Sequence, residues 1–156
     1  MRKIEEQIRK AVQPHEELCV MGTSLGGFYA LQLRIAGLRQ VIAWNPVIFP
    51  ALQLGKFIGE NTRFTDGEKW YFDRDALISY AAAADPRIWK NFAWRKKYAS
   101  IDDAPDRPNR IIFLGDRDEV LDHEIAAVFW EGHAPVHIIS SGHSIENFDH
   151  ILDYLQ

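Results

Sequence analysis

The chain has 156 residues, of which 47% are hydrophobic, and it carries a formal net charge of −4. This length and composition suit one domain with its own core, and the net negative charge argues against a nucleic-acid-binding surface. No apolar run reaches the roughly 20 residues that a membrane span needs, and no signal-peptide segment follows Met1. The single cysteine, Cys19, is expected to be buried and forms no intrachain disulfide, so we predict a cytoplasmic protein.

The first third of the chain reads as alternating helices and strands. Apolar residues at helical spacing predict a helix over residues 2–12. An apolar run predicts a strand at 18–21, and a helical pattern covers 25–36 after it. Residues 41–44 form a continuous apolar run, which is typical of a buried parallel strand.

The stretch 47–109 differs from its surroundings in composition. It holds most of the aromatic residues, together with two short helical patterns at 75–84 and 86–98. We interpret it as a lid-like insertion within one domain that spans residues 1–156.

The alternation resumes after this insertion. Strands are predicted at 110–114 and 136–139, and helices at 121–130 and 145–155. Strands that alternate with helices indicate an α/β fold, doubly wound, with a mainly parallel sheet and helices on both faces.

A G-x-S-x-G motif lies between the strand at 18–21 and the helix that follows it. Its serine is Ser24, and its glycines are Gly22 and Gly26, with Gly27 directly after. A strand, a sharp turn and a helix are the context of a nucleophile elbow, in which the turn exposes the serine hydroxyl above the sheet. The alternative interpretation is a serine that only caps the helix.

A serine nucleophile needs a histidine base and a carboxylate that orients it. His143 follows the last predicted strand and is the candidate base; the alternative is a structural loop histidine. Asp118 follows the strand at 110–114 and is the preferred acid, because it fits a Gly-x-x-Asp-x-x-Leu pattern seen at this place in many hydrolases. Asp116 is the alternative acid, and Asp122 reads as the N-cap of the next helix.

These motifs resemble the α/β-hydrolase superfamily, and more closely its small bacterial YqiA-like esterase branch. The resemblance rests on four segments: Gly22-Thr23-Ser24-Leu25-Gly26-Gly27, Trp44-Asn45-Pro46, Asp118-Glu119-Val120-Leu121-Asp122 and Gly142-His143-Ser144. It implies Ser24 as nucleophile, Asp118 as acid and His143 as base, with the Leu25 N–H group in the oxyanion hole. The implied activity is hydrolysis of small or medium acyl esters or thioesters, without a metal or organic cofactor.

The chain departs from that family in one respect. The family normally starts with a strand ending in a His-Gly-type loop, which supplies a second oxyanion donor, and nothing before Ser24 resembles it. We therefore expect an N-terminally shortened fold whose nucleophile strand is a sheet edge, with Leu18 and Val20 exposed. Such an edge predicts a homodimer formed by strand pairing. The alternative function is a catalytically weak or inactive hydrolase-fold protein with a binding or assembly role.

Overall fold

The computed structural model describes most of the chain, namely residues 2–13, 16–63, 66–83, 108–145 and 147–155. The described residues belong to two compact units. One unit draws on residues 1–47 and 91–156, and the other comprises residues 48–90.

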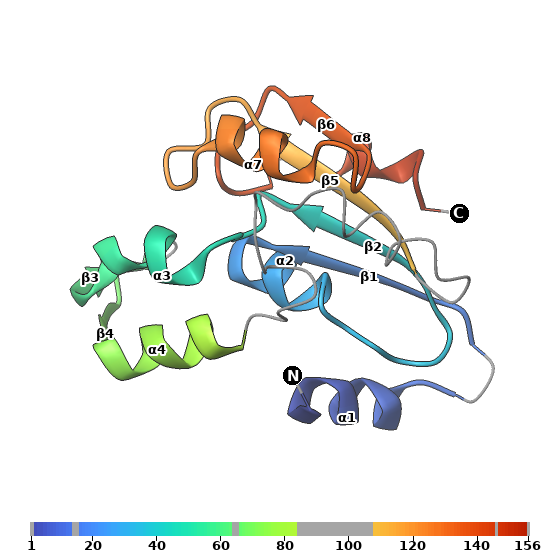
Figure 1. The fold of residues 1–156 in the computed structure, drawn as a ribbon, viewed down its shortest axis with the longest axis horizontal. Coiled ribbons are helices and arrows are strands. Elements are labelled where there is room, and N and C mark those ends of the chain that lie inside the picture. The colour runs from blue at the N-terminus through green and yellow to red at the C-terminus, as the bar shows by residue number, and fades with distance from the viewer. Residues whose placement is uncertain (1, 14–15, 64–65, 84–107, 146, 156) are drawn as a thin grey trace. The chain divides into compact units, whose positions relative to one another are not determined.

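The first unit is built on a four-stranded parallel sheet with the strand order β1-β2-β5-β6 (Figure 1). Its strands are β1 (Leu18–Thr23), β2 (Leu38–Trp44), β5 (Asn109–Gly115) and β6 (Val136–Ile139). All three neighbouring pairs are parallel, which confirms the predicted α/β fold with its parallel sheet. Strand β6 has its predicted bounds, whereas β1, β2 and β5 are longer than the predicted runs at 18–21, 41–44 and 110–114. The backbone ladder continues into flanking residues that the apolar runs excluded.

Among the described residues, the helices of this unit are α1 (Arg2–Ala11), α2 (Ser24–Ala30), α7 (His123–Trp130) and α8 (Asp149–Leu152). Helix α2 packs against β1 and β2, and α7 packs against β5 (Figure 1). On one face of the sheet, Trp44 and Phe113 stack with ring centroids 5.6 Å apart and pack with Ile151 of α8. These side chains belong to a cluster of buried hydrophobic residues in the core of the unit.

Helix α2 ends six residues earlier than its apolar pattern suggests. After Ala30 the chain tightens into bonds of the i to i−3 type, from Gln32 N to Tyr29 O and from Leu33 N to Ala30 O. The Arg34 N–H group then donates to Glu5 Oε1 of α1 at 3.1 Å. The tertiary contact with α1 therefore takes up a backbone donor that a longer helix would have used.

The second unit contains a hairpin that the sequence did not predict. The described elements of this unit are α3 (Pro50–Gln53), the short 3₁₀ helix η1 (Gly55–Phe57), the antiparallel strands β3 (Gly59–Thr62) and β4 (Lys69–Phe72) that form the hairpin, and α4 (Arg74–Ala82). Helix α4 corresponds to the predicted helical pattern at 75–84, and Asp73 caps it by accepting the Ala76 N–H group at 2.7 Å. The pattern at 86–98 lies outside the described residues.

Strand β1 is an edge of the sheet in the described part of the chain, as predicted, and pairs only with β2. The expectations for its side chains were wrong. Cys19 and Met21 are exposed, whereas Leu18 and Val20 are half-buried. Side chains alternate between the two faces of a strand, so one face of this edge is solvated and carries Cys19, whose Sγ donates to Gln40 Oε1 at 3.2 Å.

None of the described helices has the length and the apolar character needed to cross a membrane.

Candidate active site

Ser24 follows the last residue of β1 and begins α2 in a strained backbone conformation. Its φ of +50° lies in the left-handed region, which non-glycine residues rarely adopt. Such strain concentrates at functional sites, where the surrounding structure enforces it. The helix N-cap is Thr23 and makes no side-chain capping bond, so the interpretation of Ser24 as a simple cap was wrong.

Two of the three glycines around Ser24 lie where the strand and the helix approach closely. A Cβ atom on Gly22 would lie 2.5 Å from Gly26 O and 2.6 Å from Gly26 C. A Cβ atom on Gly27 would lie 3.0 Å from Gly22 O and 3.1 Å from Pro46 Cβ. By contrast, a Cβ atom on Gly26 would meet nothing within 4 Å. The residues that this turn demands are Gly22 and Gly27, whereas the motif names Gly22 and Gly26.

Asp118 and His143 are brought together from two loops. His143 Nδ1 lies 3.0 Å from Asp118 Oδ1 and 2.9 Å from Asp118 Oδ2. The Asp118 side chain is 1% exposed and the His143 side chain 17% exposed. A buried carboxylate on Nδ1 fixes the ring orientation and leaves Nε2 as the nitrogen that can take up a proton.

The Asp118 carboxylate is held in its ionised form. Burial raises the pKa of Asp118, but hydrogen bonds from His143 and from the N–H groups of Leu121 and Val120 outweigh it, so the net shift is downward. The two backbone donors lie 2.8 Å and 2.7 Å from Asp118 Oδ1. The carboxylate can therefore stabilise an imidazolium at His143 without taking its proton.

The other carboxylates of this loop have different partners. Asp116, the alternative acid, accepts the Ser141 N–H group at 3.2 Å, and Glu119 accepts the His143 N–H group at 3.0 Å. Asp122 accepts the N–H groups of Glu124 and Ile125 and is the N-cap of α7, as predicted. Of the loop's acids, Asp118 is the one paired with the imidazole.

Asn45 is a buried polar residue, named so far only as part of the Trp44-Asn45-Pro46 segment. Its Nδ2 donates to Gly142 O at 2.9 Å and to His143 O at 3.0 Å, and its Oδ1 accepts the Gly115 N–H group at 2.8 Å. It is 2% exposed, with a φ of +42°. A positive φ is not readable from sequence, and the partners are 70 to 98 residues away, so no local signal identifies this role.

The parallel sheet places the Ser24 turn, the Asp118 loop and the His143 loop at the carboxyl ends of its strands. Thr23 at the end of β1 pairs with Trp44 at the end of β2, and Gly115 at the end of β5 pairs with Ile139 at the end of β6. The carboxyl ends of the strands are where α/β sheets form their sites. In the described part of the chain no hydrogen bond joins Ser24 to His143; such bonds commonly tighten only once substrate is bound.

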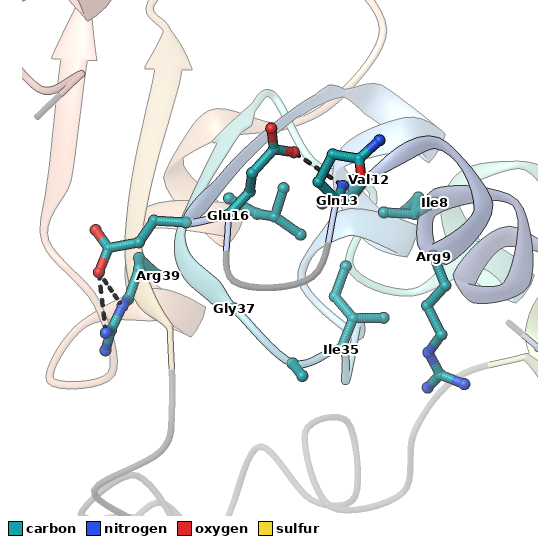
Figure 2. A pocket seen from close by; sticks show the side chains of 11 residues that line it. Ile8, Arg9, Val12, Gln13, Glu16, Ile35, Gly37 and Arg39 are labelled. Carbon is teal, nitrogen blue, oxygen red and sulfur yellow. Dashed lines mark hydrogen bonds and ion pairs between the residues drawn. The ribbon is translucent and has the colours of Figure 1, made fainter.

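A separate pocket of about 460 Å³ lies at the other end of β1. Figure 2 shows its lining, which comes from α1, from the segment before β1 and from residues 35–39. It borders Leu18, the first residue of the strand, whereas Ser24 follows the last. The pocket therefore does not serve the candidate site. Within the described residues, no group of three or more His, Cys, Asp or Glu side chains is arranged to hold a metal ion.

Comparison with protein families places the chain. A family model described as "Uncharacterised protein family (UPF0227)" matches residues 1–156. The chain belongs to the UPF0227 family. This confirms the resemblance to YqiA-like proteins. A search of curated proteins gave no match.

Solved structures share the fold of this UPF0227 chain. The esterase domain of a Rhodothermus marinus protein is 15% identical, with a TM-score of 0.58 over 95% of this chain and 60% of that one. Est1E from Butyrivibrio proteoclasticus is 16% identical, with a TM-score of 0.56 over 96% of this chain and 62% of that one. The UPF0227 chain thus spans about three fifths of the length of these esterases.

Proposed function

We propose that this protein is a serine hydrolase that cleaves small or medium acyl esters or thioesters through Ser24, His143 and Asp118. The observation that carries the proposal is the pairing of His143 with the buried Asp118 carboxylate, with Nδ1 2.9 Å from Asp118 Oδ2. Ser24, strained in a strand-to-helix turn at the same carboxyl end of the sheet, is the proposed third residue of the triad. The esterase structures that share the fold are consistent with this chemistry.

In the proposed reaction, Ser24 Oγ attacks the acyl carbonyl while His143 Nε2 takes up the hydroxyl proton. Asp118 stabilises the imidazolium that forms, and the imidazolium then protonates the leaving alcohol or thiol. A water molecule, deprotonated by His143, attacks the resulting acyl-enzyme, and Ser24 leaves with the proton. The net reaction consumes one water and yields an acid together with an alcohol or thiol.

The proposed oxyanion donor is the backbone N–H group of Leu25. This group belongs to the first turn of α2, where a helix offers no acceptor of its own. A single donor is a weak oxyanion hole, because the loss of one donor typically costs about 10²–10³ in rate. We therefore expect slow turnover unless a second donor comes from elsewhere.

Three further proposals concern a lid, the oligomeric state and the location of the protein. The aromatic insertion at 47–109 is proposed to act as a lid that contributes to the acyl pocket, an assignment that rests on its composition. The edge of β1 is proposed to pair with the same edge of a second copy, since its outer backbone groups have no strand partner among the described residues. A location in the cytoplasm is proposed on the single cysteine.

The function is tested by turnover of a p-nitrophenyl ester series, together with labelling by a fluorophosphonate. We expect turnover and labelling by the wild-type protein, and loss of both in Ser24→Ala and in His143→Ala. Asp116→Asn is the matched control for Asp118→Asn, because both remove one carboxylate from the same loop. A folded wild-type protein that neither turns over nor reacts would refute the hydrolase and favour the binding or assembly role.

Pairing at the β1 edge is tested by light scattering coupled to size-exclusion chromatography. We expect a dimer, and we expect Met21→Pro to shift it toward monomer. The Leu18 N–H group donates to Gly37 O on the β2 side, so the alternate donors of β1, among them the Met21 N–H group, face the open edge. Proline at Met21 removes one of these outer donors. A wild-type protein that runs as a monomer across micromolar concentrations excludes the dimer.

A further inference from the structure

We propose that Asn45 is a positioning residue for His143, an inference that rests on the hydrolase function proposed above. Asn45 follows β2, and its side chain bonds to the end of β5, which leads into the Asp118 loop, and to the loop that carries His143. Among the residues that the structure describes, the hydrogen-bond partners of this side chain are backbone atoms of Gly115, Gly142 and His143, and none is the Asp118 carboxylate or the His143 ring. Its action on the reaction is therefore indirect, through the backbone of the histidine loop.

The carboxamide of Asn45 bonds to backbone partners through both its nitrogen and its oxygen. Nδ2 has two hydrogens, and they go to Gly142 O and His143 O, at 2.9 Å and 3.0 Å. Oδ1 accepts the N–H group of Gly115, the last residue of β5, at 2.8 Å. Among side chains of this size, only a primary amide offers two donors and an acceptor together. One residue thus ties the end of β5 to the two residues at the tip of the histidine loop.

The backbone of Asn45 is adapted to this task. Its φ of +42° is disfavoured for most side chains, and asparagine is among the non-glycine residues that tolerate it best. The same turn continues to Val47, whose N–H group donates to Ser24 O at 3.1 Å. A single turn at residues 45–47 is therefore bonded to the serine and also to the histidine loop.

These contacts hold His143 from two sides of its backbone. Asn45 binds its carbonyl, and Glu119 Oε2 accepts its N–H group at 3.0 Å. The loop also passes very close to Gly115, where a Cβ atom would collide with Ser141 O and would lie 2.7 Å from Gly142 O. If the Asn45 donors are removed, we expect this loop to withdraw and the imidazole to move relative to Ser24. A displacement of about 1 Å can cost about 100-fold in rate.

The test variant is Asn45→Asp. Aspartate keeps an acceptor for Gly115 and tolerates the positive φ, but it replaces the two donors with an oxygen that repels the two carbonyls. The matched control is Gln32→Glu. Gln32 is 4% exposed in the same unit, and its Nε2 donates to Phe28 O at 3.0 Å. This control makes the same amide-to-acid change at similar burial, away from the histidine loop.

On p-nitrophenyl acetate we expect Asn45→Asp to lower kcat by about 10- to 100-fold with KM within threefold. Gln32→Glu is expected to retain kcat within about twofold, even if it lowers the melting temperature. A loss confined to KM, or an equal loss of kcat in both variants, would overturn the positioning role. If Asn45→Asp does not fold, Asn45→Gly accepts the backbone conformation and carries the same expectation.

A second readout is independent of turnover. The Nδ1 proton of His143, hydrogen-bonded to Asp118, should give a downfield proton resonance by NMR, assigned by its absence in His143→Ala. We expect this resonance to broaden or vanish in Asn45→Asp and to persist in Gln32→Glu. If the wild-type protein shows the resonance but no turnover, the hydrolase proposal fails while the positioning of His143 is still measured. An unchanged resonance in folded Asn45→Asp overturns the inference.

Discussion

Alanine substitutions at the two glycines of the G-x-S-x-G motif test which of them the close approach of strand and helix requires. We predict that Gly22→Ala destabilises the protein and that Gly26→Ala does not. Both changes add one methyl group within two residues of Ser24. The difference lies in the space that the methyl group meets, because neither glycine has a positive φ.

The magnitude follows from the neighbouring atoms. A Cβ atom on Gly22 would have three backbone atoms within 2.8 Å, whereas carbon atoms in contact are normally about 3.5–4.0 Å apart. Strand and helix must separate to relieve this overlap, and overpacking of this kind costs about 1–3 kcal/mol. Because the atoms are backbone and cannot rotate away, we expect the upper part of that range. Alanine at Gly26 instead gains about 0.5–1 kcal/mol from helix propensity in α2.

The assay is urea unfolding followed by tryptophan fluorescence, with the melting temperature as a second measure. At this chain length each 1 kcal/mol corresponds to roughly 2–4 °C. We expect Gly22→Ala to unfold at lower urea than the wild type, and Gly26→Ala to unfold at equal or higher urea. Equal destabilisation by both substitutions would show that the close approach is not the reason why position 22 requires glycine.

Further predictions concern Asp118, Ser24 and Cys19. The pKa of Asp118 is lowered in the folded state, so its contribution to stability is present above the unfolded value of about 3.9 and is lost as the pH falls through the folded value. The destabilisation caused by Asp118→Asn should therefore be full at pH 6 and shrink below about pH 4; a penalty independent of pH would contradict this. Ser24→Gly should be more stable than Ser24→Ala by about 1 kcal/mol in thermal unfolding, because only glycine relieves the φ of +50°; equal melting temperatures would mean that the turn is not strained. Cys19 is exposed, so its thiol should react with Ellman's reagent in the native protein. The reaction should be slower than that of a small-molecule thiol, because partial burial raises the pKa of Cys19. A reaction that requires denaturant would contradict the exposure.

Much of the sheet could be predicted from local sequence. The apolar runs around Val41 and Ile112 contain too little alternation for a half-exposed strand, and both are buried in parallel strands. The hairpin of β3 and β4 was missed for the opposite reason. The residues of β3, Gly59–Thr62, are mostly poor strand formers, so their pairing with β4 depends on the tertiary context and not on propensity.

The burial of Cys19 was mispredicted because an apolar run does not say which side of a strand is covered. The run from Leu18 to Met21 reads as uniformly buried, yet alternate residues face solvent at an edge. The location of β1 at the edge was predicted from the resemblance to a longer family fold. That inference fixed the strand's neighbours but not which of its faces would be solvated.

The sequence by itself determined the elements whose causes are local: the strand-turn-helix of the elbow, the caps at Asp73 and Asp122, and the parallel class of the sheet. Tertiary structure decided the remainder of the site. It paired Asp118, out of several carboxylates in one loop, with His143. It also made Asn45 a link between the end of β5 and the His143 loop. The physical reason is range, because a cap bonds to residues two or three positions away, whereas these bonds join residues whose separation along the chain is closed only when the sheet has formed.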